Sequence, residues 1–275
     1  MSKIKEVFSG GKAFIPFITV GDPDAESTVK FVLAAAEAGA DLIELGIPFS
    51  DPTAEGPIIQ EADCRAIQAG MTVAGAFEVV RKIREANADI PLAFMTYLNP
   101  VFKYPGDGTF STNGMDEYYE PFFAQCSIVG ITALIIPDLP YEEHGEVLPY
   151  CDKYGIELIS MISPTSKDRI RRIAEEARGF IYVVSSMGVT GVRSSFQYNS
   201  IADMVSLIRA TNPDIPCAVG FGISTPDQAA RMAGISDGAI VGSAIMRLIH
   251  QYGGESQQVI RDYVAEMKNA VMSVV

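Results

Sequence analysis

The residue of this sequence best suited to acid–base chemistry is Glu44, in the stretch DLIELGIPF. Apolar residues flank it on both sides, and no lysine or arginine lies between Lys30 and Arg65. A carboxyl group in apolar surroundings without a cation has a raised pKa and can exchange a proton near neutral pH. The alternative is a carboxylate that reaches solvent at the rim of a strand.

Two further acids follow in the segment GIPFSDPTAEGP. Asp51 precedes Pro52, and its side chain can simply fold a turn. Glu55 has no such local role, so it is the stronger candidate for a second catalytic acid. The segment 43–55 is therefore expected to supply a pair of carboxyl groups, Glu44 and Glu55.

Two glycine sites indicate a phosphate-bearing ligand. The sequence GFGIS (220–224) follows one apolar run, while Gly242 and Ser243 follow the next and open a helical pattern. Glycine lets the backbone approach a ligand, and the free N–H groups at a helix start attract anions. Gly191 can complete such a cradle from a preceding loop. One GxG alone is weak evidence, but two sites in this order favour phosphate.

Aromatic residues stand at the ends of several apolar runs. These residues are Phe17, Tyr97, Tyr182 and Phe221. They can line a pocket for a flat aromatic ligand. They can equally fill the last layer of a packed barrel, and the sequence leaves both interpretations open.

Several chemistries lack the residues they need. A Schiff-base aldolase requires a lysine at a strand end, and Lys103 lies several residues into a loop. The histidines, His144 and His250, fall in helical patterns, so no metal site is expected. Acid–base catalysis by carboxyl groups on a phosphorylated substrate remains.

Apolar, β-branched runs alternate with helical patterns along the whole chain. The predicted strands are 13–19, 41–45, 91–97, 131–136, 156–161, 179–184, 216–220 and 238–241. The predicted helices are 26–39, 58–69, 73–87, 116–128, 142–154, 167–177, 200–211, 226–233, 243–252 and 256–272. Continuous apolar strands are typical of a parallel sheet covered on both faces.

This alternation predicts an α/β fold with one domain over residues 1–275, a single (β/α)8 TIM barrel of the phosphate-binding type. A doubly wound open sheet fits less well, because the turn after the first strand, TVGDPDAE, is not glycine-rich. Long loops are expected at 46–57, 99–115 and 185–199, on the active-site end of the barrel. The last is expected to be a lid. The 99–115 loop can also be a surface insertion.

The 275 residues carry a formal net charge of −13, which argues against nucleic-acid and anionic-membrane surfaces. No apolar run approaches the roughly 20 residues of a membrane span, and no signal peptide is expected. The four cysteines are far apart without a CxxC pair, so buried, reduced thiols and a cytoplasmic location are expected.

Five stretches together resemble the tryptophan synthase alpha chain family. They are FIPFITVGDP (14–23), IELGIPFSDPTAEGPIIQ (43–60), MGVTG (187–191), GFGIS (220–224) and GSAI (242–245). The resemblance implies retro-aldol cleavage of indole-3-glycerol phosphate to indole and glyceraldehyde 3-phosphate. It also implies a partner, the beta chain of an alpha–beta–beta–alpha heterotetramer, which receives the indole. Pyridoxal phosphate is expected in that partner, and no cofactor is expected in this chain.

The resemblance also implies a role for individual residues. Glu44 matches the family's acid–base glutamate, and Glu55 matches the acid that hydrogen-bonds the indole N–H. The positions that match contacts to the indole ring are Phe17, Met95, Tyr97, Tyr182 and Phe221. Thr190 matches the lid, and Gly191, Gly222, Gly242 and Ser243 match the phosphate site. Asp51 and Pro52 match the loop that contacts the beta chain.

This sequence departs from the family pattern at Glu55, where aspartate is usual, and at Thr53, where an aliphatic residue is usual. The insertion at 103–114 is also longer than expected. One added methylene can displace a catalytic group by about 1 Å, enough to cost roughly 10²-fold in rate. The alternatives are therefore a regulatory alpha chain with weak catalysis and a free-standing lyase that releases indole. Another phosphate-binding barrel, such as an isomerase, is the least favoured.

Overall fold

A computed structural model of the chain describes residues 3–105, 116–184, 194–220 and 222–274. The strands form one parallel sheet in the order β5-β4-β3-β2-β1-β9-β8-β7-β6. The strands are β1 (Ala13–Thr19), β2 (Ile43–Gly46), β3 (Leu92–Met95), β4 (Ala133–Ile135), β5 (Glu157–Leu158), β6 (Ser160–Ile162), β7 (Ile181–Val184), β8 (Cys217–Gly220) and β9 (Gly238–Val241).

The sheet is closed into a barrel by a split strand. β5 pairs with β4 and β6 pairs with β7, and only Ile159 separates β5 from β6. The backbone N–H of Ile159 still donates to the carbonyl of Leu134, at 2.8 Å. The predicted strand 156–161 is thus two short strands that join the two edges of the sheet. The predicted TIM barrel is confirmed.

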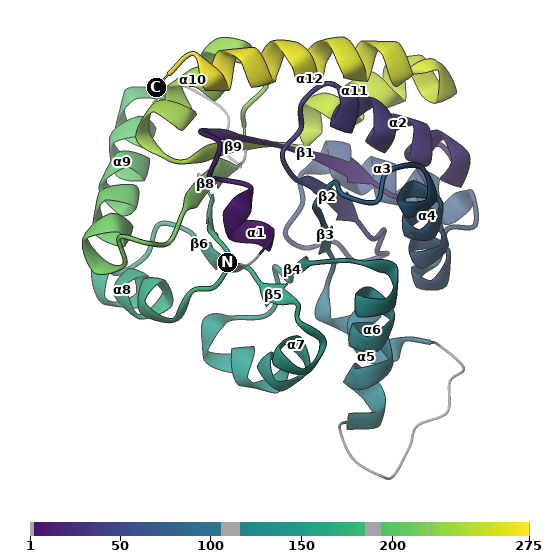
Figure 1. The fold of residues 1–275 in the computed structure, drawn as a ribbon, viewed down its shortest axis with the longest axis horizontal. Helices are drawn as coiled ribbons and strands as arrows, with labels where there is room; N and C mark the ends of the chain where they lie inside the picture. The colour runs from purple at the N-terminus through teal and green to yellow at the C-terminus, as the bar shows by residue number, and fades with distance from the viewer. Residues whose placement is uncertain (1–2, 106–115, 185–193, 221, 275) are drawn as a thin grey trace.

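Helices surround the ring of strands (Figure 1). The helices are α1 (Lys3–Glu6), α2 (Ala25–Glu37), α3 (Pro57–Gln68), α4 (Val73–Ala86), α5 (Leu98–Lys103), α6 (Asp116–Val129), α7 (Leu148–Tyr154), α8 (Lys167–Glu176), α9 (Ser194–Thr211), α10 (Pro226–Ile235), α11 (Ser243–Tyr252) and α12 (Gln257–Met272). Two 3-10 helices, η1 (Tyr141–Glu146) and η2 (Gly253–Glu255), complete the described elements. Local capping fixes several starts: Asp24 accepts from the backbone N–H of Ser27 at 2.8 Å, and Thr225 and Gln228 form a capping box on α10.

Three predicted segments were wrong in detail. The helix predicted over 142–154 is η1 followed by α7, because Pro149 has no N–H to continue a helix. Part of the predicted loop 99–115 is helix α5, in which Pro100 sits in the first turn, where its missing N–H costs nothing. Helix α9 begins at Ser194, within the predicted loop 185–199.

Helix α1, which was not predicted, closes the end of the barrel at which the strands begin. Its Ile4 is fully buried, and a Cβ on Gly179, just before β7, would lie 3.0 Å from the Cγ2 of Ile4. The rings of Phe8 and Phe180 pack at 5.4 Å between centroids. Apolar side chains of α1 and the segment after it therefore pack against the start of β7 at this end of the barrel.

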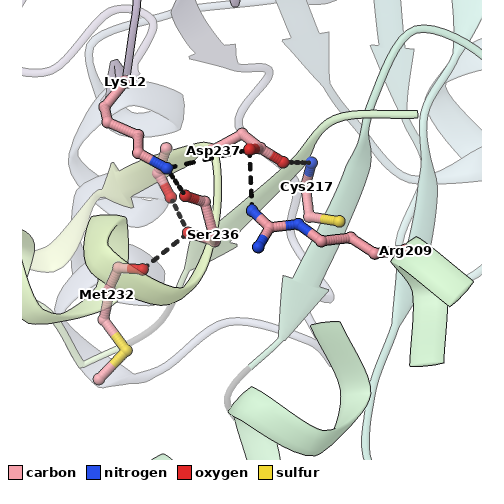
Figure 2. A network of polar contacts seen from close by, with 7 residues as sticks. Lys12, Arg209, Cys217, Met232, Ser236 and Asp237 are labelled. Atoms are coloured by element: carbon pink, nitrogen blue, oxygen red, sulfur yellow. Dashed lines mark hydrogen bonds and ion pairs between the residues drawn. The ribbon is translucent and has the colours of Figure 1, made fainter. Parts of the chain in front are cut away.

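A polar network fixes the starts of three strands (Figure 2). Asp237, just before β9, accepts from the backbone N–H of Cys217 at the start of β8 and from Arg209 of α9, each at 2.9 Å. Lys12, just before β1, donates to the carbonyl of Ser236 at 2.6 Å. β1, β8 and β9 are thus held together at one end, and the predicted phosphate site follows the other ends of β8 and β9.

The prediction of buried, reduced thiols is confirmed for three of the four cysteines. All four are free thiols, and Cys126, Cys151 and Cys217 are buried. Cys64 is exposed on α3, so the prediction of burial was wrong at that position. None of the helices that the structure describes is long and apolar enough to cross a membrane.

Candidate active site

Strand register brings the predicted site residues together on the inner face of the barrel. Phe17 of β1 is in register with Glu44 of β2, and Gly46 is in register with Met95 of β3. Because alternate residues of a strand share a face, Glu44, Gly46 and Met95 point the same way. Phe94, on the other face, instead packs against Phe77 of α4 at 5.4 Å.

Glu44 is buried without a partner. Glu44 is 1% exposed, and neither of its carboxyl oxygens has a hydrogen-bond partner among the described residues. Burial raises the pKa of Glu44 to about 8, because the charged form loses its hydration. The alternative of a carboxylate at a solvated rim was wrong, and Glu44 is a neutral acid at pH 7.

Glu55 lies in a different environment, on the loop between β2 and α3. It is half-buried, and the hydroxyl of Tyr97 donates a hydrogen bond to its Oε2. Burial raises the pKa of Glu55 to about 7, and the charge of Asp138 adds to this, while the backbone N–H groups of Glu55 and Ala54 oppose it. Burial therefore raises the pKa of both carboxyl groups, and only Glu55 has a hydrogen-bond donor to its carboxylate among the described residues.

Two glycines make room for the aromatic walls. A Cβ on Gly46 would collide with the ring of Phe17, and a Cβ on Gly220 would collide with the ring of Tyr182. Glycine is required at both places because the rings lie directly over the backbone. Phe17 and Tyr182 are each 4% exposed, so both are packed into the barrel rather than presented to solvent.

The acids and the aromatic residues lie around the same interior end of the barrel, which we call the pocket. Burial, followed by the charges of Glu44 and Glu55, raises the pKa of Tyr182 well above its ordinary value. β7 lies across the barrel from β2, so these groups interact through the interior. Tyr97 is 3% exposed and Met95 is 7% exposed, and the ring of Tyr97 packs against Phe49 at 5.1 Å. The pocket thus has apolar walls and two carboxyl groups.

The predicted phosphate positions lie at the same end of the barrel, after β8 and β9. Gly222 has φ +76°, a left-handed conformation that favours glycine. Ser243 is the first residue of α11, and Gly242 precedes it with no side chain to cap the helix. The free N–H groups of this first turn are suited to an anion. A Cβ on Gly242 would lie 3.3 Å from Cδ1 of Phe17, so this site borders the aromatic pocket.

Three predicted residues, Thr190, Gly191 and Phe221, lie outside the described residues. Asp51 and Pro52 lie on the outer part of the loop after β2, where Asp51 is exposed and accepts from the hydroxyl of Ser50 at 2.6 Å. These two residues are accordingly not part of the pocket. They are accessible to a second protein.

Sequence reasoning missed two buried acids beside the site. Asp22, 1% exposed, accepts from Nε and Nη2 of Arg65 at 2.9 and 2.7 Å, which ties the loop after β1 to α3. Asp63 of α3 is 4% exposed, and burial raises its pKa to about 7, with a further contribution from the charge of Glu55. Asp22 lies in the stretch FIPFITVGDP, but its contact with Arg65 joins residues 43 positions apart and is not visible in the sequence; Asp63 lies in none of the distinctive stretches.

Within the described ranges, no group of three or more His, Cys, Asp or Glu side chains is placed to hold a metal ion. The acids of the pocket can transfer protons. Two carboxyl groups with raised pKa values, aromatic walls and a helix N-terminus can together bind a flat phosphorylated molecule and move protons on it.

Comparisons with known proteins find one family along nearly the whole chain. The profile of the tryptophan synthase alpha chain family matches residues 4–273. The tryptophan synthase alpha chain of Lacticaseibacillus casei is 46% identical over 271 residues, covering 98% of this chain and 96% of the relative. That of Lactiplantibacillus plantarum is 47% identical over 274 residues, covering 98% and 97%.

Solved structures agree with the sequence relatives. The crystal structure of tryptophan synthase subunit alpha from Legionella pneumophila superposes with a TM-score of 0.84 at 33% identity, covering 98% of each chain. The aminoacrylate-bound form of tryptophan synthase from M. tuberculosis superposes with a TM-score of 0.83 at 28% identity, covering 98% of this chain and 100% of that one.

Proposed function

This chain belongs to the tryptophan synthase alpha chain family, and on that premise we propose that the pocket around Glu44 is where it cleaves indole-3-glycerol phosphate. The enzyme is a lyase whose products are indole and glyceraldehyde 3-phosphate. We also propose a role for each residue of this pocket. We further propose that residues 1–275 act as one domain, since the described strands belong to one sheet.

Glu44 is the proton donor to C3 of the indole ring. The bond between C3 and the adjoining glycerol carbon can break only after C3 is protonated, because the indolenine so formed can accept the electron pair of that bond at its nitrogen. A carboxyl group with a pKa of about 8 holds its proton at pH 7, and neither oxygen of Glu44 has a hydrogen-bond partner among the described residues. The proton of Glu44 therefore goes to the substrate.

Glu55 is the acceptor for the indole N–H. As C3 gains a proton, the nitrogen must lose one, and a carboxylate at hydrogen-bond distance takes it. The hydroxyl of Tyr97 stabilises the ionised form of Glu55 and holds its direction. The two acids thus start in opposite protonation states: burial without a partner favours the proton on Glu44, whereas the Tyr97 hydroxyl favours the ionised form of Glu55.

The C–C bond then breaks in the second half of the reaction. The carboxylate of Glu44 removes the proton of the neighbouring glycerol hydroxyl, and that carbon becomes the aldehyde of glyceraldehyde 3-phosphate. The electron pair of the bond moves through C2 to the ring nitrogen, which recovers its proton from Glu55. Both acids return to their starting states, so one site performs both proton transfers.

The remaining residues of the site bind the substrate. Phe17, Met95, Tyr97 and Tyr182 surround the indole ring, and Gly222, Gly242 and Ser243 bind the phosphate. The roles of Thr190, Gly191 and Phe221 in the lid, the phosphate site and the ring pocket rest on the family pattern alone.

The chain acts with a beta chain, as members of the family form alpha–beta complexes. The chain carries no cofactor of its own, and pyridoxal phosphate belongs to the beta chain. We assign Asp51 and Pro52 to the contact with that partner, because both lie on the exposed part of the loop that also carries Glu55. We assign the protein to the cytoplasm, in keeping with four free cysteines.

The observation that carries the proposal is the buried, unpartnered carboxyl group of Glu44 inside an aromatic pocket. The test is an indole assay with the purified chain and indole-3-glycerol phosphate, alone and with a beta chain from a relative. We expect slow indole release alone and faster release with the beta chain. No indole under either condition would contradict the proposed function.

A further inference from the structure

Thr19, the last residue of β1, has a buried hydroxyl without a partner. The residue is 0% exposed, and its Oγ1 has no hydrogen-bond partner in the part of the chain that the structure describes. The two carboxyl oxygens of Glu44 also lack a hydrogen-bond partner there. A buried polar group without a partner costs stability, and such groups are uncommon in folded proteins. Two of them on neighbouring strands indicate a polar molecule that binds there.

Strand register places Thr19 inside the barrel. Phe17 pairs with Glu44 and Thr19 pairs with Gly46, so Thr19 lies on the face of β1 that carries Phe17. Gly46 has no side chain to cover it. Thr19 is also two residues closer than Phe17 to the end of the strand at which the loops of the active site begin. Thr19 therefore shares the inner face of the barrel with Glu44 and lies nearer the mouth of the pocket.

Thr19 also lies next to the phosphate site. β1 is hydrogen-bonded to β2 on one side and to β9 on the other. The backbone N–H of Thr19 donates to Sδ of Met246 at 3.4 Å, and Met246 is in the first turn of α11, the helix that begins at Ser243. A substrate that reaches from Glu44 to the N-terminus of α11 must pass the end of β1.

We propose that the Thr19 hydroxyl is a substrate-binding group that hydrogen-bonds a hydroxyl of the three-carbon chain between the indole ring and the phosphate. The inference rests on the proposed function and adds a specificity-determining residue to it. Thr19 and Glu44 would together supply the polar partners for a hydroxylated chain in an otherwise apolar pocket. A chain without hydroxyl groups would leave both unpaired.

Thr28 provides a matched comparison within the same protein. It is also 0% exposed, but its hydroxyl accepts from the backbone N–H of Gly21 and donates to the carbonyl of Asp24, each at 2.9 Å. Thr28 is thus a buried threonine with a structural role that accounts for its hydroxyl. The hydroxyl of Thr19 makes no such structural hydrogen bond within the described residues, and we therefore assign it to substrate binding.

The experiment compares Thr19→Val, which keeps the shape and removes the hydroxyl, with Thr19→Ser, which keeps the hydroxyl. We expect Thr19→Val to lower kcat/KM for indole-3-glycerol phosphate by roughly 3- to 10-fold, as for loss of one neutral hydrogen bond. Its affinity for 3-(indol-3-yl)propyl phosphate, which lacks both chain hydroxyls, should stay within about twofold of the parent's. Thr19→Ser should keep most of the activity, and the Tm of Thr19→Val should be unchanged or higher.

Thr28→Val is the control. It should lower the Tm, because it removes two hydrogen bonds, and it should leave the ratio of affinities for the two ligands unchanged. The inference is overturned if Thr19→Val cleaves the substrate as fast as the parent, or if it weakens both ligands equally. An inactive parent would instead contradict the proposed function, and calorimetric affinities for the two ligands would still decide the role of Thr19.

Discussion

The hydroxyl of Tyr97 donates a hydrogen bond to the carboxylate of Glu55 and accepts one from the backbone N–H of Ala54 at 2.8 Å. One side chain at the end of β3 therefore holds both the loop after β2 and the acid that this loop carries. Gln60 adds a second tie, from its Nε2 to the carbonyl of Glu55 at 2.9 Å. Glu55, which is one methylene longer than the usual aspartate, is thus held through both its side chain and its backbone.

Removing that hydroxyl tests the contact. In Tyr97→Phe, the ionised form of Glu55 loses a donor, so its pKa should rise and the acidic limb of the pH–rate profile should move to higher pH. We also expect kcat/KM at pH 7 to fall by roughly 3- to 10-fold. Tyr154→Phe is the control, because its hydroxyl donates to Glu120 at 2.6 Å, away from the pocket. An acidic limb in the same place for Tyr97→Phe and the parent would argue against the assignment.

The pH dependence of the parent enzyme follows from the two acids. Glu55 must be ionised to accept a proton, and burial raises its pKa to about 7. Glu44 must be protonated to donate one, and burial raises its pKa to about 8. We therefore expect kcat/KM to fall below about pH 7 and above about pH 8, with a narrow maximum between. A profile that is flat from pH 5 to 7 would show that Glu55 does not need to ionise.

Glu44 also makes stability depend on pH. Its pKa is about 8 in the folded chain and 4.5 in the unfolded chain, so the folded state retains a proton that the unfolded state releases. The destabilisation is absent below pH 4.5, grows as the pH rises toward 8, and amounts to about 3 kcal/mol at pH 7. Glu44→Gln should therefore be more stable than the parent, and the gain should be larger at pH 8 than at pH 5.

Urea unfolding at the two pH values measures this difference. Glu26→Gln serves as the control, since Glu26 is exposed in the first turn of α2. Equal gains for Glu44→Gln at pH 5 and pH 8 would mean that the carboxyl group is not held neutral by burial.

The parts of this fold that follow from local pattern could be predicted. β1, β9 and α11 occupy the residues expected, because each is a predominantly apolar or amphipathic segment whose pattern is visible in the sequence. The break at Ile159 could not be predicted, because it depends on which neighbour each half of the strand pairs with. Helix α5 was read as loop because Asn99 and Pro100 are common in turns.

The candidate site also has residues that could be predicted from the sequence and residues that could not. Glu44 was identified because its apolar neighbours and the absence of a nearby cation are visible in the sequence, and its burial confirms that reasoning. The contact between Tyr97 and Glu55 joins residues 42 positions apart, so it depends on the register of β2 and β3. Thr19 could not be recognised either, because a threonine at a strand end is ordinary until its hydroxyl is found without a partner.

The central claim is that Glu44 moves the proton that allows the C–C bond to break. The most direct measurement is the kcat/KM of Glu44→Gln for indole release from indole-3-glycerol phosphate, with the beta chain present and folding checked by circular dichroism. Glutamine keeps the shape of the side chain but cannot exchange a proton, so the rate should fall by roughly 10²- to 10⁴-fold. A folded Glu44→Gln enzyme that releases indole within about threefold of the parent rate would contradict the claim.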